Sequence, residues 1–290
     1  MPVLILGADR EAWLAALREA MPDERFVLEP EEGIDAAVVA NPPPGSLQNL
    51  PGLRLIQSVW AGVDRLLQDP TLPPDVPLAR MVDPAMNEAM VHTALWAVLS
   101  LHRSFFELAA QQRAQLWQQP LQPRAAEWRV LVLGRGELGG RVAAALEVQG
   151  YAVSTWRSSD GPEPPLEGAD TVVNLLPLTP ATRGFFDAAR LARMKHGASL
   201  VNLARGAHVV EADLLAALDA GRLRRAVLDV FETEPLPPGH RLWTHPRVTV
   251  LPHCAAQTDP RSALEVVVAN LRALRAGEPL RHLVDRRRGY

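Results

Sequence analysis

Short apolar runs and amphipathic stretches alternate along the second half of the chain. Runs rich in Val, Leu and Ala predict strands at residues 130–134, 152–156, 171–176, 200–203, 226–230 and 248–251. Helical patterns lie between most of these runs, at 138–149, 186–195 and 211–220, and Gly150 follows the first as a cap. Strands and helices that alternate in this order predict a doubly wound parallel sheet. The crossover at 158–168 is short and rich in proline, so we expect little or no helix there.

The first half of the chain repeats this plan. The apolar run at 3–7 and the pattern after it resemble the 130–134 run and its helix, and strand-like runs at 36–40 and 53–58 extend the series. We therefore predict an α/β fold of two Rossmann-like domains, connected by a helix at about 87–103 and again by one at about 259–276. The predicted domains are a discontinuous, flavodoxin-like substrate domain of residues 1–96 plus 270–290, and a dinucleotide-binding Rossmann domain of residues 97–269. The last residues, 278–290, are expected to rejoin the first domain.

Composition narrows the class of protein. The chain has 290 residues, of which 48% are apolar and 22% charged, and its net charge is −3, as is typical of a globular protein with two domains. Its single cysteine, Cys254, excludes an internal disulfide and fits a reducing cytoplasm. The longest apolar runs are far shorter than the ~20 residues of a membrane helix. The only concentrated basic stretch is 286–288. We expect a cytoplasmic protein that binds neither membranes nor nucleic acid.

A glycine motif at 134–139 follows a predicted strand and opens a helix, which is the context that the pattern GxGxxG requires. Gly134 allows the tight turn, Gly136 lets the backbone approach a pyrophosphate, and Gly139 allows close packing of helix on strand. The N-terminus of the helix adds unpaired N–H groups and the positive end of its dipole. A glycine-rich turn without a ligand is the alternative, but the strand and helix around the motif favour dinucleotide binding.

The end of the next predicted strand bears on which dinucleotide is bound. NAD-binding sheets usually carry an acidic residue there, which accepts hydrogen bonds from the ribose 2′-hydroxyl. Here the strand ends in Arg157, Ser158 and Ser159, and a guanidinium with two hydroxyls suits a 2′-phosphate. These residues favour NADP. The alternative is that Arg157 is merely exposed and that Asp160 folds back to take the place of the acid.

Three polar side chains follow three other predicted strands. Arg205 comes after 200–203, Glu234 after 226–230 and His253 after 248–251. The carboxyl ends of parallel strands meet at one edge of a sheet, where ligands bind in open α/β folds. An arginine, a glutamate and a histidine at that edge suit the reduction of a keto acid. Taken singly, each has an ordinary alternative, namely an exposed arginine, a glutamate beside a helix and a buried, hydrogen-bonded histidine.

Other segments add to these motifs, at 59–64, 175–182, 201–211, 228–238, 242–248, 252–253 and 288–290. Together they resemble the D-isomer-specific 2-hydroxyacid dehydrogenase family, and most of all its glyoxylate/hydroxypyruvate reductase A branch. The resemblance runs over nearly the whole chain and is weakest before residue 50. It implies a homodimer and a small 2-keto or 2-hydroxy acid as substrate. The expected cofactor is NADP, with NAD possible, and no metal is expected.

The resemblance also assigns roles to particular residues. It implies that Arg205, Glu234 and His253 are catalytic, and that the substrate is bound by Trp60, Ala61, Gly62, Arg205 and His253. It implies a cofactor site made of Gly134, Arg135, Gly136, Glu137, Leu138, Gly139, Arg157, Ser158, Leu176, Pro177, Thr182, Leu203, Ala204, Asp229 and Ala255.

The chemistry of reduction fits these assignments. Reducing a 2-keto acid takes a hydride from C4 of the nicotinamide and a proton, which His253 can donate as an imidazolium. Glu234, bonded to the other ring nitrogen, would favour the charged form, and Arg205 would hold the carboxylate or the carbonyl oxygen. Trp60 stands where many relatives have a small residue. It predicts a narrow pocket for glyoxylate or hydroxypyruvate, the alternative being that it packs between domains.

Two other functions stay open on the sequence. One is a dehydrogenase for a bulkier D-2-hydroxy acid that uses NAD. The other is a non-catalytic, dinucleotide-sensing protein of the same fold. The intact set of Arg205, Glu234 and His253 argues against a sensor, because a sensor needs no proton donor.

Overall fold

The computed structural model describes residues 1–290, which form two compact units. One unit combines Met1–Met86 with Thr258–Tyr290, and the other is Asn87–Gln257. The predicted boundaries, after residue 96 and before residue 270, need correction because they cut through helices α3 (Pro84–His102) and α9 (Pro260–Ala276). The apolar face of α3 from Met90 to Leu101 belongs to the core of the second unit, and α9 packs along α1 (Arg10–Ala20) of the first. The chain therefore divides near the beginning of each long helix.

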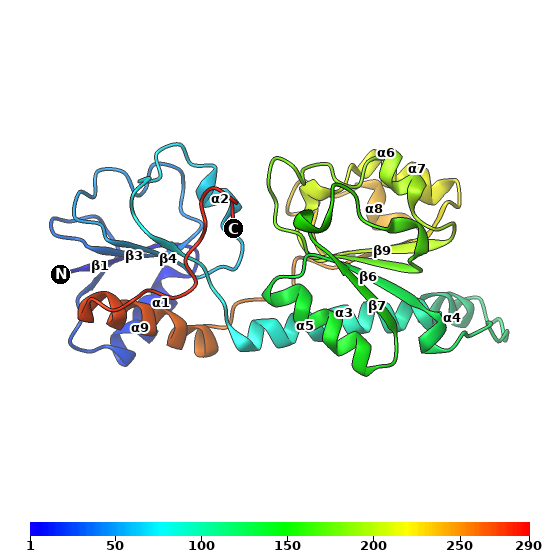
Figure 1. Ribbon diagram of the computed structural model, residues 1–290. Helices are drawn as coiled ribbons and strands as arrows, with labels where there is room; N and C mark the ends of the chain where they lie inside the picture. The colour runs from blue at the N-terminus through cyan, green and yellow to red at the C-terminus, as the bar shows by residue number, and fades with distance from the viewer. The chain divides into compact units, whose positions relative to one another are not determined.

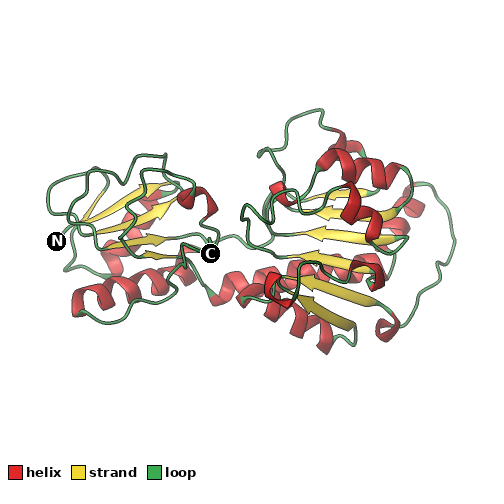
Figure 2. Cartoon of the chain, turned by 45° about the horizontal axis from the view of Figure 1, so that its top comes forward, coloured by secondary structure: helices red, strands yellow, loops and turns green.

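The first unit is built on a five-stranded parallel sheet with the strand order β2-β1-β3-β4-β5. Figures 1 and 2 show strands of this sheet close to the mark of the N-terminus. Its strands are β1 (Val3–Gly7), β2 (Phe26–Val27), β3 (Ala36–Ala40), β4 (Leu55–Ser58) and β5 (Leu78–Ala79). Helices α1 and α9 cover one face, and the short α2 (Asp64–Leu67) lies on the other (Figure 1). Every residue of β3 is buried, which is why the sequence shows an unbroken apolar run there rather than an alternating one.

The C-terminal segment belongs to this first unit, as predicted. The Val284 N–H donates to the Leu78 carbonyl oxygen at 2.8 Å, and an isolated antiparallel bridge pairs Ala79 with Leu283. Arg275, near the end of α9, connects this helix to the segments that directly precede β2 and β3. Its guanidinium contacts Glu24 at 2.8 Å and the fully buried Asp35 at 2.5 Å.

The second unit is built on a six-stranded parallel sheet with the order β11-β10-β9-β8-β6-β7. Its strands are β6 (Arg129–Leu133), β7 (Ala152–Trp156), β8 (Thr171–Asn174), β9 (Ala198–Asn202), β10 (Leu223–Leu228) and β11 (Val248–Val250). One face packs on α3 and α5 (Glu137–Val148), the other on α6 (Ala188–Arg193), α7 (Glu211–Asp219) and α8 (Arg241–Thr244) (Figure 1). The predicted doubly wound fold is confirmed. Its strand order reverses between β6 and β8, the point where such sheets bind ligands.

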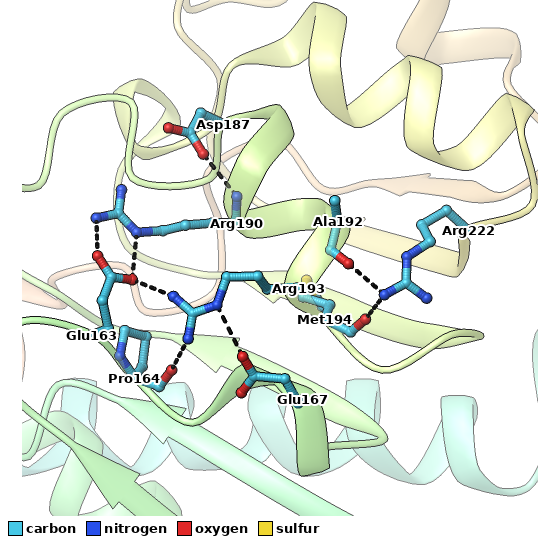
Figure 3. A network of polar contacts seen from close by, with 9 residues as sticks. All are labelled: Glu163, Pro164, Glu167, Asp187, Arg190, Ala192, Arg193, Met194 and Arg222. Carbon is cyan, nitrogen blue, oxygen red and sulfur yellow. Dashed lines mark hydrogen bonds and ion pairs between the residues drawn. The ribbon is translucent and has the colours of Figure 1, made fainter.

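The proline-rich crossover between β7 and β8 has no α-helix, as predicted. It contains only two 3₁₀ turns, η2 (Ser158–Asp160) and η3 (Leu166–Gly168). Ion pairs with α6 hold it in place instead (Figure 3). Arg190 and Arg193 both bind the Glu163 carboxylate, at 2.8 and 2.6 Å, and Arg193 also reaches Glu167 at 2.9 Å.

Several short elements have no counterpart in the sequence pattern. They are β2, β5, α2, α8, the helix α4 (Phe105–Arg113), and the 3₁₀ turns η1 (Ala125–Glu127) and η4 (Gly206–His208). Elements of two to four residues are too short to show a period, and α4 lies on the surface without a single buried residue. No helix combines the length and the apolar character that crossing a bilayer would take.

Candidate active site

The glycine turn after β6 has the geometry that a pyrophosphate needs. Gly134 has a φ of +96°, and α5 begins three residues later, at Glu137. A Cβ on Gly139 would lie 1.6 Å from the Gly134 carbonyl oxygen, so only glycine lets the helix start this close to the strand. A Cβ on Gly136 would meet nothing within 4 Å, so the backbone there borders open space. The open backbone and the first-turn N–H groups of α5 fit the phosphates of a dinucleotide.

The loop after β8 borders the glycine turn across the switch point. A Cβ on Gly134 would lie 2.5 Å from the Leu175 carbonyl oxygen. Thr182 closes this loop, because its hydroxyl donates to the Pro177 carbonyl oxygen at 2.7 Å and accepts from the Thr179 N–H at 2.8 Å. The predicted cofactor residues Leu176, Pro177 and Thr182 thus share a single closed loop.

Arg157 and Arg135 meet at the carboxylate of Asp160. Asp160 folds back over the turn, where it accepts from the backbone N–H and the Nε of Arg157, each at 3.1 Å. Arg135, from the glycine motif, approaches the same carboxylate at 3.8 Å. The side chains of Arg157 and Arg135 are 55% and 45% exposed. Asp160 therefore folds back to the end of β7, as the alternative interpretation with an exposed Arg157 expected. There its carboxylate lies between two accessible guanidinium groups.

His253 and Glu234 form a hydrogen-bonded pair at the carboxyl edge of the sheet. The Nδ1 of His253 lies 2.7 Å from Oε2 of Glu234, whose Oε1 accepts from the Phe231 N–H at 2.9 Å. The backbone of His253 is left-handed, with a φ of +51°, and its N–H donates to the Asp229 carbonyl oxygen at 2.9 Å. With Nδ1 engaged, Nε2 is the ring atom left to face a substrate.

Arg205 lies close enough to act on both members of this pair. Its charge lowers the pKa of His253 and that of Glu234. The turns that carry them are also in contact, because a Cβ on Gly206 would lie 1.8 Å from the Phe231 carbonyl carbon. The structure thus brings the three predicted catalytic residues together at one edge of the second unit.

The electrostatics of the pair favour a protonated imidazole. The hydrogen bond to Glu234 raises the pKa of His253 above its usual value, and this outweighs the opposing effects of burial and of the Arg205 charge. Burial by itself would raise the pKa of Glu234, but the hydrogen bonds from His253 and the Phe231 N–H bring that pKa below its usual value. An ionised carboxylate therefore faces a histidine that keeps its proton to a higher pH than a free one.

The side chain of Asp229 holds the loop that carries His253 by hydrogen bonds to its backbone. It is 1% exposed, and its carboxylate accepts from the N–H groups of Cys254 and Ala255 at 2.8 and 3.0 Å. Burial raises the pKa of this carboxyl group, against the effect of the two backbone hydrogen bonds. Its expected contact with the cofactor stays a prediction. The structural role was missed, although an acid directly after a buried strand is a signal for it.

Asn174, Asn202 and His208 were not predicted from the sequence. All three are fully buried, and Asn202 is hydrogen-bonded to the backbone of Arg205. Asn174 and Asn202 are the last residues of β8 and β9, so each is a polar residue that ends an apolar strand. That position was the available signal, because a polar side chain buried at a strand end must find hydrogen-bond partners. The predicted cofactor residues Leu203 and Ala204 follow directly and are also buried.

The predicted substrate residues Trp60, Ala61 and Gly62 lie in the first unit, directly after β4. The Ser58 hydroxyl donates to the Trp60 carbonyl oxygen and accepts from its N–H, both at 3.1 Å. The Thr258 hydroxyl holds the preceding residue by donating to the Val59 carbonyl oxygen at 3.0 Å. Trp60 is 37% exposed, and its expected contact with the substrate stays a prediction.

Comparison with known proteins agrees with this geometry. The model of the D-isomer specific 2-hydroxyacid dehydrogenase NAD-binding domain matches residues 95–255, more than half of the chain. The chain belongs to this family of oxidoreductases. A glyoxylate/hydroxypyruvate reductase A from Serratia proteamaculans (strain 568) is 40% identical over 302 aligned residues, which cover 97% of this chain and 96% of that protein. The predicted family is therefore confirmed.

Two solved structures of the family are similar over the full length. One, a D-isomer specific 2-hydroxyacid dehydrogenase from Xanthobacter autotrophicus Py2 in complex with NADPH and MES, has a TM-score of 0.92 and 38% identity. The other, an NADPH-dependent glyoxylate/hydroxypyruvate reductase from Sinorhizobium meliloti in complex with NADP and sulfate, has a TM-score of 0.91 and 36% identity. Each match covers 100% of this chain and 99% of the other.

Proposed function

We propose that this dehydrogenase reduces small 2-keto acids with NADPH, converting glyoxylate to glycolate and hydroxypyruvate to D-glycerate. The observation that carries the proposal is the 2.7 Å pair of His253 and Glu234 beside Arg205, at the edge of a dinucleotide-binding sheet. The substrates are those in the names of the relatives from Serratia proteamaculans and Sinorhizobium meliloti.

His253 is the proton donor in this proposal. Its Nε2 delivers a proton to the carbonyl oxygen as that oxygen becomes an alkoxide, while Glu234 keeps the ring oriented and charged through Nδ1. In the reverse direction the neutral ring takes the proton back. The raised pKa of His253 keeps the donor form populated near neutral pH.

Arg205 is the anion-binding group. A guanidinium can hold the substrate carboxylate or the carbonyl oxygen, and it stabilises negative charge that develops during reduction. The backbone of Trp60–Gly62 is proposed to bind substrate as well, with the Trp60 ring restricting the acid to two or three carbons.

The cofactor site is proposed to lie along the glycine turn and the loop after β8. When bound, the nicotinamide supplies the hydride. The turn at 134–139 fits the pyrophosphate, and Arg157, Arg135 and Ser158 would hold a 2′-phosphate in the place where Asp160 now binds the two arginines. NADPH is the preferred cofactor. NADH is also accepted, because Asp160 can accept a hydrogen bond from a ribose hydroxyl, but it is bound more weakly because it has no 2′-phosphate for the arginines.

A homodimer is part of the proposal, with α3 and α4 as the pairing face. These helices border a hollow of about 550 Å³, largely apolar, lined by His92, Leu95, Trp96, Leu99, Ser100, Phe105 and Phe106. Trp117 and Leu121, in the segment after α4, are 95% and 93% exposed. Exposed apolar side chains and an apolar hollow on one pair of helices and the segment after them support an interface there. A Trp117→Ser variant that sediments as the wild type does would count against it. A cytoplasmic location is also proposed, supported by the single cysteine.

Initial rates of NADPH and NADH oxidation with glyoxylate and with hydroxypyruvate test the function. We expect turnover with both acids and faster turnover with NADPH. The variant His253→Ala should lose roughly 10²- to 10⁴-fold in kcat, the usual contribution of a general acid. His196→Ala, at an exposed histidine in the same unit, should leave the rate unchanged. NADPH binding without turnover of any keto acid would refute the enzyme and favour a sensor.

A further inference from the structure

A buried polar network joins the ends of β8 and β9 to the turn that carries Arg205. Its members, Asn174, Asn202 and His208, are all 0% exposed. The Asn174 amide nitrogen donates to Asn202 Oδ1 and to His208 Nδ1, both at 2.9 Å. The Asn202 amide nitrogen donates in turn to the Arg205 carbonyl oxygen at 3.0 Å. A chain of side-chain hydrogen bonds thus ends on the backbone of Arg205.

Backbone groups fix the orientation of both amides. Asn174 Oδ1 accepts from the Leu176 N–H, and Asn202 Oδ1 accepts from the Ala204 N–H, each at 3.3 Å. Turning either amide over would set its NH₂ group against a backbone N–H, donor against donor. The nitrogen of Asn202 must therefore face the Arg205 carbonyl oxygen.

The same constraint fixes the tautomer of His208. Asn174 offers only hydrogens to Nδ1, so this ring nitrogen must accept. The other ring nitrogen, Nε2, lies 3.3 Å from the Pro177 carbonyl oxygen, which can only accept. The proton therefore sits on Nε2, and the ring is neutral.

The Arg205 turn is held from its other side as well. The close contact between Gly206 and the Phe231 backbone leaves no room for a side chain. Phe231 donates its N–H to Glu234, the partner of His253. Any shift of the Arg205 turn would therefore move Phe231 and, through it, Glu234 and His253.

We propose that Asn202, oriented by Asn174 and by neutral His208, is a positioning residue that holds Arg205 in place for the substrate. None of the three touches reacting atoms, so they act only through Arg205. The proposal rests on the function above, in which Arg205 binds the keto acid.

The variant Asn202→Asp tests it with almost no change in shape. An aspartate still accepts from Asn174 and Ala204, but it sets a carboxylate oxygen against the Arg205 carbonyl oxygen. Val201→Ala is the matched control, since it removes buried atoms from the same strand and leaves the network intact. We expect Asn202→Asp to raise the KM for hydroxypyruvate at least tenfold. Val201→Ala should lower thermal stability at an unchanged KM. An unchanged KM in Asn202→Asp, or an equal rise in both variants, overturns the proposal.

A second measurement does not depend on turnover and is read from the wild-type protein, with one variant used only to assign the signal. In wild-type protein labelled with ¹⁵N-histidine, the shifts of the His208 ring nitrogens should show a neutral ring with its proton on Nε2. His208→Gln assigns the resonance. A proton on Nδ1, or a charged ring at neutral pH, overturns the network. If the wild type turned over no keto acid, the proposed function would fail, while this spectrum would still decide on the network.

Discussion

Replacing Glu234 by Gln should disable the proton donor without removing it. In the wild type, Oε1 of Glu234 accepts from the Phe231 N–H while Oε2 faces Nδ1 of His253. The amide oxygen of the variant keeps the bond to the backbone, which sets its NH₂ group against Nδ1. A ring nitrogen that faces a donor must be unprotonated. The variant therefore favours the neutral imidazole of His253, which is a far weaker acid than the imidazolium.

The size of the effect follows from one charge-assisted hydrogen bond. Such a bond is worth about 1.5–3 kcal/mol. The side chains of His253 and Glu234 are 54% and 34% exposed, so solvent screens the pair and the lower half of that range applies. Since about 1.4 kcal/mol of barrier is a factor of ten, kcat for reduction should fall roughly 10- to 50-fold.

The pH dependence gives the sign of the effect. Because the pKa of His253 is raised, wild-type reduction should be full at low pH and fall as the pH rises through that pKa. In Glu234→Gln the fall should begin at a lower pH, and oxidation of the hydroxy acid should show the mirror image. Initial rates at saturating NADPH and hydroxypyruvate, taken across the pH range, measure both limbs. Glu232→Gln, at the exposed neighbouring carboxylate, is the control. A Glu234→Gln enzyme within threefold of wild type at every pH would refute the reasoning.

Three further predictions concern cofactor binding and stability. Arg157→Ala should raise the KM for NADPH roughly 10- to 100-fold and that for NADH less than twofold, as one charge-assisted contact of about 1.5–3 kcal/mol is lost; Arg241→Ala, another exposed arginine paired with an aspartate, should change neither. Gly139→Ala should abolish tight NADPH binding in a fluorescence titration, because its Cβ would overlap the Gly134 carbonyl oxygen. Gly140→Ala, whose Cβ meets nothing, should bind normally and be stabilised by about 0.4–1 kcal/mol. Arg275→Met should destabilise the first unit by about 3 kcal/mol, seen as an earlier urea midpoint in tryptophan fluorescence, because it removes the hydrogen-bonded partner of the buried Asp35 carboxylate and leaves it only Arg54, at 3.9 Å; a loss under about 1 kcal/mol would show that the ion pair is not needed.

The sequence predicted the strands and helices whose apolar positions form a run or a helical period, and the polar residues that directly follow those strands. The run at 36–40 matches β3 residue for residue, because a buried parallel strand needs apolar side chains on both faces. The run at 152–156 also matches β7, which lies at the edge of its sheet and alternates more exposed with less exposed residues. The positions of Arg205, Glu234 and His253 followed from the same logic, since the carboxyl ends of parallel strands share one edge. Their meeting could be foreseen from the order of strands alone.

Contacts between residues distant in sequence could not be foreseen. Asp229 holds the loop of His253 through its side chain and Asn202 holds Arg205, but nothing in the local pattern says which backbone groups lie within reach. The division of the chain failed for a related reason. A long helix such as α3 shows its apolar positions in the sequence, but not which of two cores they enter.

The two units share a strand order, and a few positions explain why only one carries the dinucleotide motif. In both, a glycine stands where the first strand ends: Gly7 is the last residue of β1, at a φ of +97°, and Gly134 directly follows β6, at +96°. Two residues on, the second unit has Gly136, whose backbone is open, whereas the first has Asp9 at the N-cap of α1. A carboxylate at a helix N-terminus repels the phosphate that would otherwise bind there. In the first unit, residue 12 is an alanine where the second has Gly139, so its helix cannot start as close to the strand. The second unit can thus take the cofactor because its turn has glycines where the first unit has side chains, and not because its strands are arranged in a different order.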